Sequence, residues 1–337
     1  MSSLHPENIP DFMMAVRQTS SGGKLTVEKV PVPVPGPGEV LVKMAAAPLN
    51  PSDISFIKGI YGKPDQFPFT PGFEGSGIVV AAGKGFLPQI RNGKKVACSI
   101  QQGRDGTWAG YMVTSATNCV PLSHNIDLDQ GAMWLVNPMT AMALVEIALR
   151  EKHRAIVNNA AASALGKMLV SITEDYHLPL INIVRKKAQE EILKRKGAKY
   201  ILNSERKDFR DVLHQMSRAL NATLFLDAIG GEAGSLFIEI SPPESKIIAY
   251  AKLSGKNIEV DSRFLLRENK VLEGFQLGNY LKSKNMVQKI RLVNRVKKFM
   301  KKGHEISIQK TFPLQEINRA IELYTKNMSA GKVLLKP

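Results

Sequence analysis

A run of short apolar strands alternating with helices, over residues 155–251, constrains the fold more than any other feature. The strand-like segments are AIVNNA, PLINIVR, YILN, ATLFLDAI and SKIIAYA, and helical patterns such as SALGKMLVSITEDY and KKAQEEILKRKG lie between them. Strand–helix–strand alternation is typical of parallel sheets, because each helix returns the chain across one face of the sheet. The pattern predicts an α/β fold with a parallel, doubly wound sheet.

The first 120 or so residues have a different character. Residues 14–48 alternate apolar and polar side chains around the turn PVPVPGPGE, and FEGSGIVVAAGKG and NGKKVACSI continue the strand-like pattern. Near residue 127 an Asp-rich cap opens a long apolar helix. A basic helix is expected over about 280–303, and GKVLLKP is expected to form the last strand. A chain of 337 residues with two such regions predicts two domains.

The first strand and helix of the alternating region have the composition of a dinucleotide-binding turn. A pyrophosphate needs small residues so that the backbone can approach it at the helix N-terminus. The pattern G-x-G-x-x-G stands here as Ala161-x-Ser163-x-x-Gly166, and Ala164 and Leu165 complete the turn. An ordinary tight strand–helix turn is the alternative interpretation.

The end of the next strand indicates which dinucleotide would bind. About 20 residues beyond the turn, an NAD site carries an acidic residue for the ribose hydroxyls. Arg185 lies 19 residues past Gly166, and Lys186 and Lys187 follow it. A guanidinium can pair with a 2′-phosphate, which a carboxylate would repel. The sequence therefore predicts NADPH rather than NADH, with Arg185 and Lys186 as contacts and Lys187 as a solvated helix residue.

Composition narrows the remaining function classes. The formal net charge of +16 favours anionic partners, although it also serves simple solubility. Two distant cysteines, Cys98 and Cys119, suggest a reduced protein, and a disulfide between them stays open. The six histidines are scattered without metal-binding spacing. Without a signal-like N-terminus or an apolar stretch of about 18 residues, a cytoplasmic location is expected.

Taken together, these motifs resemble the medium-chain dehydrogenase/reductase superfamily over essentially the whole chain. The resemblance rests on APLNPSD, PGFEGSG, VNPMTA, the Ala/Ser/Gly turn, LDAIGG and GKVLLKP in this order. It is closest to the zinc-free branch of zeta-crystallin-like quinone oxidoreductases and 2-enoyl thioester reductases. It implies a β-rich GroES-like catalytic domain over 1–125 and 281–337 and a Rossmann NADPH-binding domain over 126–280.

The resemblance also explains why PGFEGSG lacks a metal ligand. The zinc enzymes of the superfamily carry Cys and His where this chain has Asn50 and Phe73. No four-cysteine lobe is present either, so no metal is expected. Hydride addition to an enone or quinone needs a hydrogen-bond donor for the oxygen that gains charge, and such addition can proceed without zinc.

The family's functional residues can be carried over position by position. Tyr61 and Asn50 are the catalytic candidates. A loop Tyr whose ring packs against the rim of the cleft, and an Asn that forms a turn before Pro51, are the open alternatives. The resemblance further implies cofactor contacts at Asn137, Thr140, Gly230, Gly231, Tyr250 and Lys332. A helix-interior Thr140 and a surface Lys332 are the competing interpretations, and the role of Tyr250 is open.

Three functions remain after this reading. The first is NADPH-dependent reduction of quinones or other α,β-unsaturated carbonyl compounds, and the second is reduction of 2-enoyl thioesters. The third is non-catalytic binding of NADPH or nucleic acid. The positive net charge supports this function, whereas the aromatic content of 7% provides few side chains that could stack on bases. The family resemblance implies a homodimer through the segment NKVLEGFQL, for which an internal strand is the alternative.

Overall fold

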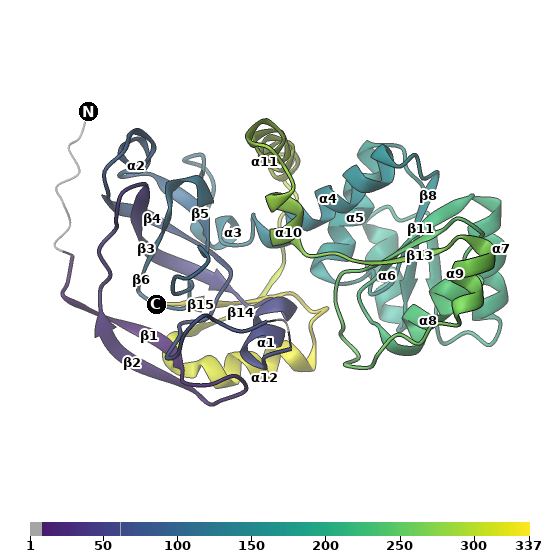
Figure 1. Ribbon diagram of the computed structural model, residues 1–337, viewed down its shortest axis with the longest axis horizontal. Coiled ribbons are helices and arrows are strands. Elements are labelled where there is room, and N and C mark those ends of the chain that lie inside the picture. The colour runs from purple at the N-terminus through teal and green to yellow at the C-terminus, as the bar shows by residue number, and fades with distance from the viewer. Residues whose placement is uncertain (1–8, 61) are drawn as a thin grey trace. The chain divides into compact units, whose positions relative to one another are not determined.

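A computed structural model describes residues 9–60 and 62–337 of the chain. The chain folds into two compact units (Figure 1). The β-rich unit comprises the described residues up to Val136 together with Gly303–Pro337. The parallel-sheet unit comprises Asn137–Lys302.

The β-rich unit contains a seven-stranded sheet and a separate antiparallel hairpin. The sheet has the order β14-β15-β3-β4-β5-β7, with β6 also paired to β3, and only β14 and β15 are parallel. The strands are β1 (Phe12–Gln18), β2 (Leu25–Pro31), β3 (Glu39–Pro48), β4 (Glu74–Ala82), β5 (Lys95–Ser99), β6 (Tyr111–Ser115), β7 (Cys119–Pro121), β14 (Ile308–Pro313) and β15 (Lys332–Lys336). The helices are α1 (Pro51–Ile57), α2 (Phe86–Arg91), α3 (Leu128–Gly131) and α12 (Ile317–Lys326), with 3-10 turns η1 (Ala116–Asn118) and η2 (Leu314–Glu316). Because β3 pairs with three strands, it is buried over most of its length, which explains its nearly continuous apolar sequence.

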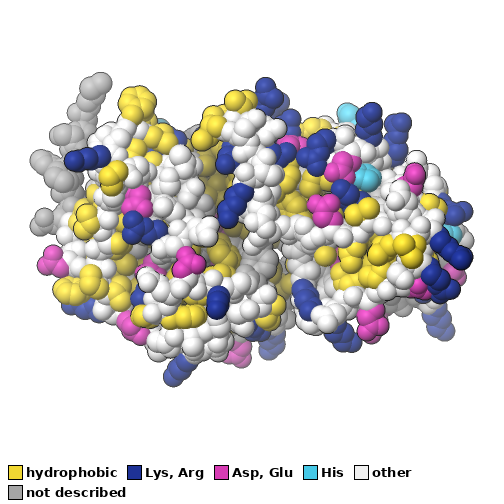
Figure 2. Space-filling model, in the orientation of Figure 1, with side chains coloured by type: hydrophobic (Ala, Val, Ile, Leu, Met, Phe, Trp, Pro, Cys, Tyr) yellow, Lys and Arg dark blue, Asp and Glu magenta, His cyan; other side chains and the backbone are white. Residues whose placement is uncertain are grey.

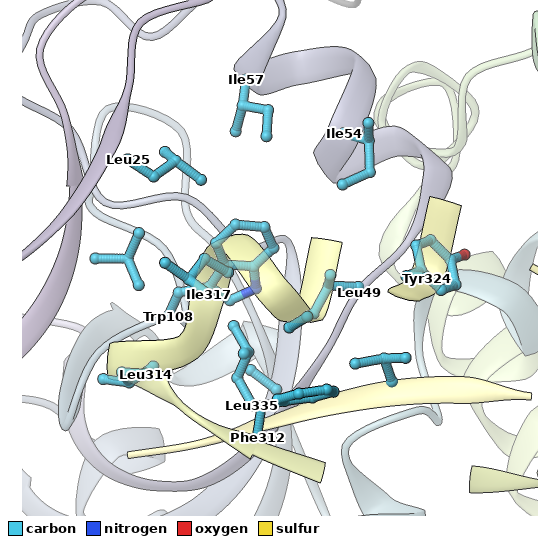
Figure 3. Close-up of a cluster of buried hydrophobic side chains, with 14 residues drawn as sticks. Leu25, Leu49, Ile54, Ile57, Trp108, Phe312, Leu314, Ile317, Tyr324 and Leu335 are labelled. Atoms are coloured by element: carbon cyan, nitrogen blue, oxygen red, sulfur yellow. The ribbon is translucent and has the colours of Figure 1, made fainter. Parts of the chain in front are cut away.

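The core of the β-rich unit contains side chains from the first 110 or so residues and from the last 30 or so residues of the chain (Figure 3). Trp108 is fully buried among side chains from early segments, such as Leu25 and Leu49, and from late segments, such as Ile317 and Leu335. The strand β15 pairs with the end of β3, with Leu334 opposite Pro48. This register brings the first residue of β15, Lys332, to the loop that follows β3.

The parallel-sheet unit has six parallel strands in the order β10-β9-β8-β11-β12-β13. The strands are β8 (Ala155–Asn158), β9 (Leu180–Val184), β10 (Tyr200–Asn203), β11 (Ala222–Asp227), β12 (Lys246–Ala249) and β13 (Val271–Gly274). The helices are α4 (Val136–Arg150), α5 (Ala164–Asp175), α6 (Lys187–Arg195), α7 (Phe209–Ala219), α8 (Gly231–Ile240), α9 (Ser262–Glu268), α10 (Leu277–Lys282) and α11 (Met286–Met300). The strand order reverses between β8 and β11, which is the feature that defines a doubly wound sheet. The expected fold class is therefore confirmed.

The boundaries between the units differ from those expected at 125/126 and 280/281. The chain passes from one unit to the other at Val136/Asn137 and at Lys302/Gly303. Residues 281–302 belong to the parallel-sheet unit because they bind Glu146 of α4. Its carboxylate accepts hydrogen bonds from the Tyr280 hydroxyl and the Lys284 ammonium, at 3.0 Å each, and from Arg295 at 3.2 Å.

The single basic helix expected over 280–303 is two helices, α10 and α11. The break is explained by Asn285, whose side chain accepts a hydrogen bond from the Gln288 N–H while Gln288 Oε1 accepts one from the Asn285 N–H, at 3.0 Å each. This reciprocal pair is a capping box, which starts a new helix. Within residues 9–60 and 62–337, no helix has the length and apolar character that crossing a bilayer requires.

One edge of the parallel sheet is exposed. Among the strands that the structure describes, β13 pairs only with β12, and all four of its residues are exposed, with Val271 at 45% and Leu272 at 36%. Leu266 of the preceding helix is 82% exposed. Figure 2 shows hydrophobic side chains gathered on this part of the unit. An unprotected apolar edge strand is a site where another strand can pair.

Candidate active site

The loop after β3 places Asn50 at the start of α1, where it is the N-cap residue before Pro51. The carboxylate of Asp53, three residues later, accepts hydrogen bonds from the backbone N–H of Asn50 at 2.8 Å and of Phe73 at 2.9 Å. Asp53 therefore ties together the two loops that carry Asn50 and Phe73. The Phe73 ring packs edge-on against Phe56, with ring centroids 5.2 Å apart.

Asn50 lies between a buried carboxylate and a buried ammonium group. Its Nδ2 donates to Glu74 Oε1 at 3.0 Å, and its Oδ1 accepts a hydrogen bond from Lys332 Nζ. Lys332 also donates to the Leu49 carbonyl at 3.3 Å. The three side chains of Asn50, Glu74 and Lys332 are at most 1% exposed, and we call them the Asn–Glu–Lys triad. Both ends of the Asn50 carboxamide are thus engaged within the β-rich unit.

The second carboxylate oxygen of Glu74 binds backbone groups where α4 begins. Glu74 Oε2 accepts hydrogen bonds from the N–H of Leu135 at 3.1 Å and of Val136 at 2.8 Å. The first N–H groups of a helix lack partners within the helix and carry partial positive charge, so they suit a carboxylate. Three donors therefore bind the carboxylate of Glu74, and the nearby charge of Lys332 also favours its ionised form.

Burial shifts the acid–base behaviour of this cluster. Loss of solvent raises the pKa of Glu74 and raises the pKa of Asp53 to about 7, against the opposing effects of their hydrogen bonds and of Lys332. Loss of solvent also lowers the pKa of Lys332, and the charges of Glu74 and Asp53 oppose that shift. The ammonium and the two carboxylates therefore depend on each other for their charged forms. In the described part of the chain, no three His, Cys or acidic side chains gather in an arrangement that could hold a metal ion.

Of the candidate residues in the β-rich part of the sequence, the structure describes Asn50 and Lys332 and does not describe Tyr61. The interpretation of Lys332 as a surface lysine is wrong, because the residue is 1% exposed. The structure brings Lys332 together with Asn50, although the sequence assigned them separate roles. Tyr61 lies outside the described residues. The sequence reasoning missed Asp53, although an acidic residue three positions after an N-cap is a recognisable capping signal.

The turn between β8 and α5 has the expected strand–turn–helix form. Ser163 is the N-cap residue of α5, and its hydroxyl accepts a hydrogen bond from the Gly166 N–H at 3.0 Å. A Cβ atom on Gly166 would lie 2.3 Å from the Ala161 carbonyl oxygen, so this close approach requires glycine. The small residues of the turn thus hold the α5 N-terminus against the end of β8.

A polar network joins the carboxyl ends of β8 and β11, the neighbouring strands at which the sheet order reverses. Asn159 Nδ2 donates to Asp227 at 2.5 Å, and Asn159 Oδ1 accepts from the Ala228 N–H at 2.7 Å. Asp227 also accepts from the Gly230 N–H at 3.0 Å. Ligands of doubly wound sheets bind at this position. The sequence reasoning did not select Asn159 or Asp227, although both are polar residues at the ends of apolar strands.

The remaining cofactor candidates lie around the same edge of the sheet. Gly230 and Gly231, with φ of 71° and 57°, lead into α8. The Tyr250 hydroxyl donates to Asn158 Oδ1 at 3.2 Å, so Tyr250 contacts the last residue of β8. Asn137 and Thr140 lie in the first turns of α4, each 8% exposed.

Arg185 and Lys186 directly follow the carboxyl end of β9 and are exposed. Their backbone N–H groups both donate to Gln189 Oε1 at 3.0 Å, which fixes the start of α6. In the described ranges, neither side chain forms an ion pair. Two cationic groups are therefore available here for an anion.

The positive charge of the chain is concentrated in the parallel-sheet unit. Residues 137–302 contain 30 Lys and Arg and 17 Asp and Glu, whereas the rest of the chain contains 16 and 13. The unit with the dinucleotide-type turn thus carries +13 of the net +16. This distribution favours an anionic ligand or partner for that unit.

Comparisons with known proteins agree with this architecture. Residues 36–124 match the family described as the alcohol dehydrogenase GroES-like domain. The mitochondrial enoyl-[acyl-carrier-protein] reductase of Caenorhabditis elegans is 27% identical over 325 residues, which cover 90% of this chain and 92% of that protein. The synaptic vesicle membrane protein VAT-1 homolog of Rattus norvegicus is 25% identical, over 90% of this chain and 78% of that protein. A crystal structure from Mesorhizobium loti, assigned as an NADPH:quinone reductase, superposes with a TM-score of 0.88 at 30% identity, over 98% of this chain and 100% of that one.

Proposed function

Since the chain belongs to the medium-chain dehydrogenase/reductase superfamily, in its zinc-free branch of quinone oxidoreductases and enoyl thioester reductases, we propose that it is an NADPH-dependent reductase of quinones or other α,β-unsaturated carbonyl compounds. The observation that carries the cofactor choice is the exposed pair Arg185 and Lys186 at the end of β9. It stands beside a turn whose Gly166 leaves no room for a Cβ atom. Both features fit a dinucleotide with an additional phosphate.

We assign the cofactor contacts to the parallel-sheet unit. The turn residues Ala161, Ser163, Ala164, Leu165 and Gly166 would face the pyrophosphate, and Arg185 and Lys186 the 2′-phosphate. The further proposed contacts are Asn137, Thr140, Gly230, Gly231 and Tyr250. When bound, NADPH supplies the hydride. The network of Asn159 and Asp227 would hold the ends of β8 and β11 in place beneath these contacts.

The role of the β-rich unit in this proposal is to bind and polarise the substrate carbonyl group. Negative charge develops on the substrate oxygen, and a positioned donor stabilises it. Tyr61 is the proposed donor. Asn50 is the second candidate, and its carboxamide is held at both ends by Glu74 and Lys332. We assign Lys332 to positioning Asn50, in place of the cofactor contact that the family resemblance implies.

Reduction of 2-enoyl thioesters is the second candidate function. It is supported by the similarity to the C. elegans enoyl-[acyl-carrier-protein] reductase over 90% of this chain. The carriers of such thioesters are phosphorylated, and the charge of +13 on the parallel-sheet unit would attract them. Enones and 2-enoyl thioesters both accept the hydride at the β-carbon, so the choice of substrate separates the two functions.

NADPH oxidation at 340 nm with a panel of acceptors tests the proposal. The panel contains 1,4-benzoquinone, 9,10-phenanthrenequinone, a simple enone and crotonyl-CoA, each with and without a chelator. Chelator-resistant turnover of a quinone or the enone is the expected result, and a preference for crotonyl-CoA would establish the second function instead. NADPH binding without turnover of any acceptor, or salt-dependent RNA binding without NADPH oxidation, would contradict both and support a binding protein.

We also propose that the chain forms a homodimer through β13. Light scattering coupled to gel filtration is expected to give twice the chain mass of 37.1 kDa. Leu272→Lys places a charge on the exposed strand and is expected to yield the monomer, because a buried lysine at a strand pair is unfavourable. Ile290→Lys is the control, since Ile290 is 52% exposed on α11, outside the edge strand. A monomeric wild type, or a dimer that survives Leu272→Lys, would contradict this proposal.

A further inference from the structure

Cys98 and Cys119 lie opposite each other on neighbouring strands of the β-rich unit. The strands β5 and β7 are antiparallel, and their register pairs Cys98 with Cys119. Directly opposite residues in a sheet point to the same face, and both side chains belong to the same buried cluster. They are the two cysteines of the chain, and both are unbridged. The sequence alone left a pairing open, whereas the register brings the two thiols together.

The pair occupies a position without backbone hydrogen bonds between β5 and β7. On its other side, β5 bonds β4, and the Ile100 N–H donates to the Phe73 carbonyl at 3.0 Å. Cys98 is two residues earlier, so its N–H and C=O also point toward β4, where its partner is Gly75. The Leu122 N–H donates to the Lys95 carbonyl at 2.9 Å, so alternate residues of β5 bond β7.

This type of position suits a disulfide. At non-hydrogen-bonded pairs of antiparallel strands, the Cα atoms are about 4.5 Å apart and the side chains are closer than at hydrogen-bonded pairs. A disulfide joins Cα atoms that are roughly 4.4–6.8 Å apart. Closing the bond therefore requires little movement of either strand.

We propose that Cys98 and Cys119 are a thiol-oxidation site at which a small-molecule disulfide closes an intramolecular bridge between β5 and β7. The thiolate of one cysteine attacks a sulfur of the small disulfide, whose S–S bond breaks and releases one thiol. The second protein thiolate then attacks the mixed disulfide and releases the second thiol. Two protein thiols are oxidised, one small disulfide is reduced to two thiols, and the two protons of the protein thiols pass to these products.

Burial makes this site slow to react while the sheet is closed. The exposure of Cys98 is 0% and that of Cys119 is 1%. Loss of solvent raises the pKa of Cys98 and raises the pKa of Cys119 to about 12, so few thiolates are present. β7 has three residues and lies at the edge of the sheet. Local opening of this short edge strand is the route by which a reagent reaches the pair.

The bridge would act on stability. It closes the loop between residues 98 and 119, which restricts the unfolded chain. The equilibrium constant for unfolding of the β-rich unit is expected to fall about a hundredfold. The site therefore makes the stability of this unit sensitive to the thiol–disulfide balance of its surroundings, whichever reaction the protein catalyses.

Tryptic mapping of the oxidised chain tests the proposal, because trypsin cleaves after Arg104, between the two cysteines. The chain is incubated with oxidised glutathione at low urea, alkylated and digested without reduction. The expected product is peptide 96–104 linked to peptide 105–150, released by dithiothreitol. It should form at a rate independent of protein concentration, and its yield should rise with urea. Cys119→Ala and Cys98→Ala should each give a glutathione adduct at the remaining cysteine.

A second measurement follows urea unfolding by tryptophan fluorescence. Oxidation is expected to shift the unfolding midpoint to a higher urea concentration, and dithiothreitol should reverse this shift. Two separate glutathione adducts, or a link between two chains, would overturn the proposal, and two free thiols would be followed by a refolding experiment. If β7 does not open in the folded protein, refolding from urea in the presence of oxidised glutathione gives the two thiols the opportunity to form the bridge. Recovery of the folded chain without the linked peptide in that experiment would also overturn it.

Discussion

Lys332→Met is expected to lower the free energy of unfolding of the β-rich unit by about 3–5 kcal/mol, the range for breaking a buried ion pair by removing one partner. The variant leaves Glu74 and Asp53 without their buried cation, and Asn50 Oδ1 without its donor. Both tryptophans, Trp108 and Trp134, lie in the β-rich unit. Urea unfolding followed by tryptophan fluorescence therefore measures this unit directly.

Lys336→Met is the matched control in the same strand. Lys336 has 48% of its side chain exposed and pairs with Asp129, so its loss should cost less than about 1 kcal/mol. The double variant Lys332→Met/Glu74→Gln should be more stable than Lys332→Met, because it no longer buries an unpaired carboxylate. Equal effects of Lys332→Met and Lys336→Met would show that the Asn–Glu–Lys triad contributes nothing beyond a surface pair.

Arg185→Glu is expected to weaken NADPH binding at least about a hundredfold and to leave NADH binding nearly unchanged. A charge-assisted hydrogen bond contributes about 1.5–3 kcal/mol, and the new carboxylate would also repel the 2′-phosphate. NADH lacks that phosphate, so it should not respond. Calorimetric titration of both nucleotides gives the two dissociation constants without requiring turnover.

Lys187→Glu is the control for this prediction. Lys187 is the first residue of α6 and is exposed, and the sequence identified it as a solvated helix residue. Reversing the charge at position 187 should change NADPH affinity only through the long-range electrostatic potential of the protein, which salt screens. The cofactor choice would be contradicted if Arg185→Glu weakened NADH and NADPH binding equally, or if Lys187→Glu matched its effect.

Local patterns predicted the parallel-sheet unit well. Each strand from β8 to β12 matches a short apolar segment of the sequence, and the turn at Ser163 and Gly166 has the expected form. These features depend on residues close together in the chain. The break at Asn285 was missed because basic residues continue on both sides of it, although Asn285 and Gln288 have the spacing of a capping box.

Contacts between segments that are distant in the sequence could not be predicted from local patterns. Lys332 and Asn50 are 282 positions apart, and only the pairing of β15 with β3 brings them together. Nothing near Lys332 in the sequence distinguishes a buried lysine from a surface one. Asn159 and Asp227, which are 68 positions apart, meet only because β8 and β11 are neighbours in the sheet.

The sequence by itself determined the class of each unit, the small-residue turn and the cationic pair Arg185 and Lys186. Each of these features depends on residues that are close together in the chain, through hydrophobic periodicity, the need for glycine or charge. The tertiary structure alone decided that Lys332 is buried beside Asn50 and Glu74, and that Cys98 faces Cys119. The physical reason is that sheet register sets these contacts. Register depends on how whole strands pack, and a shift by one residue would turn every side chain to the opposite face.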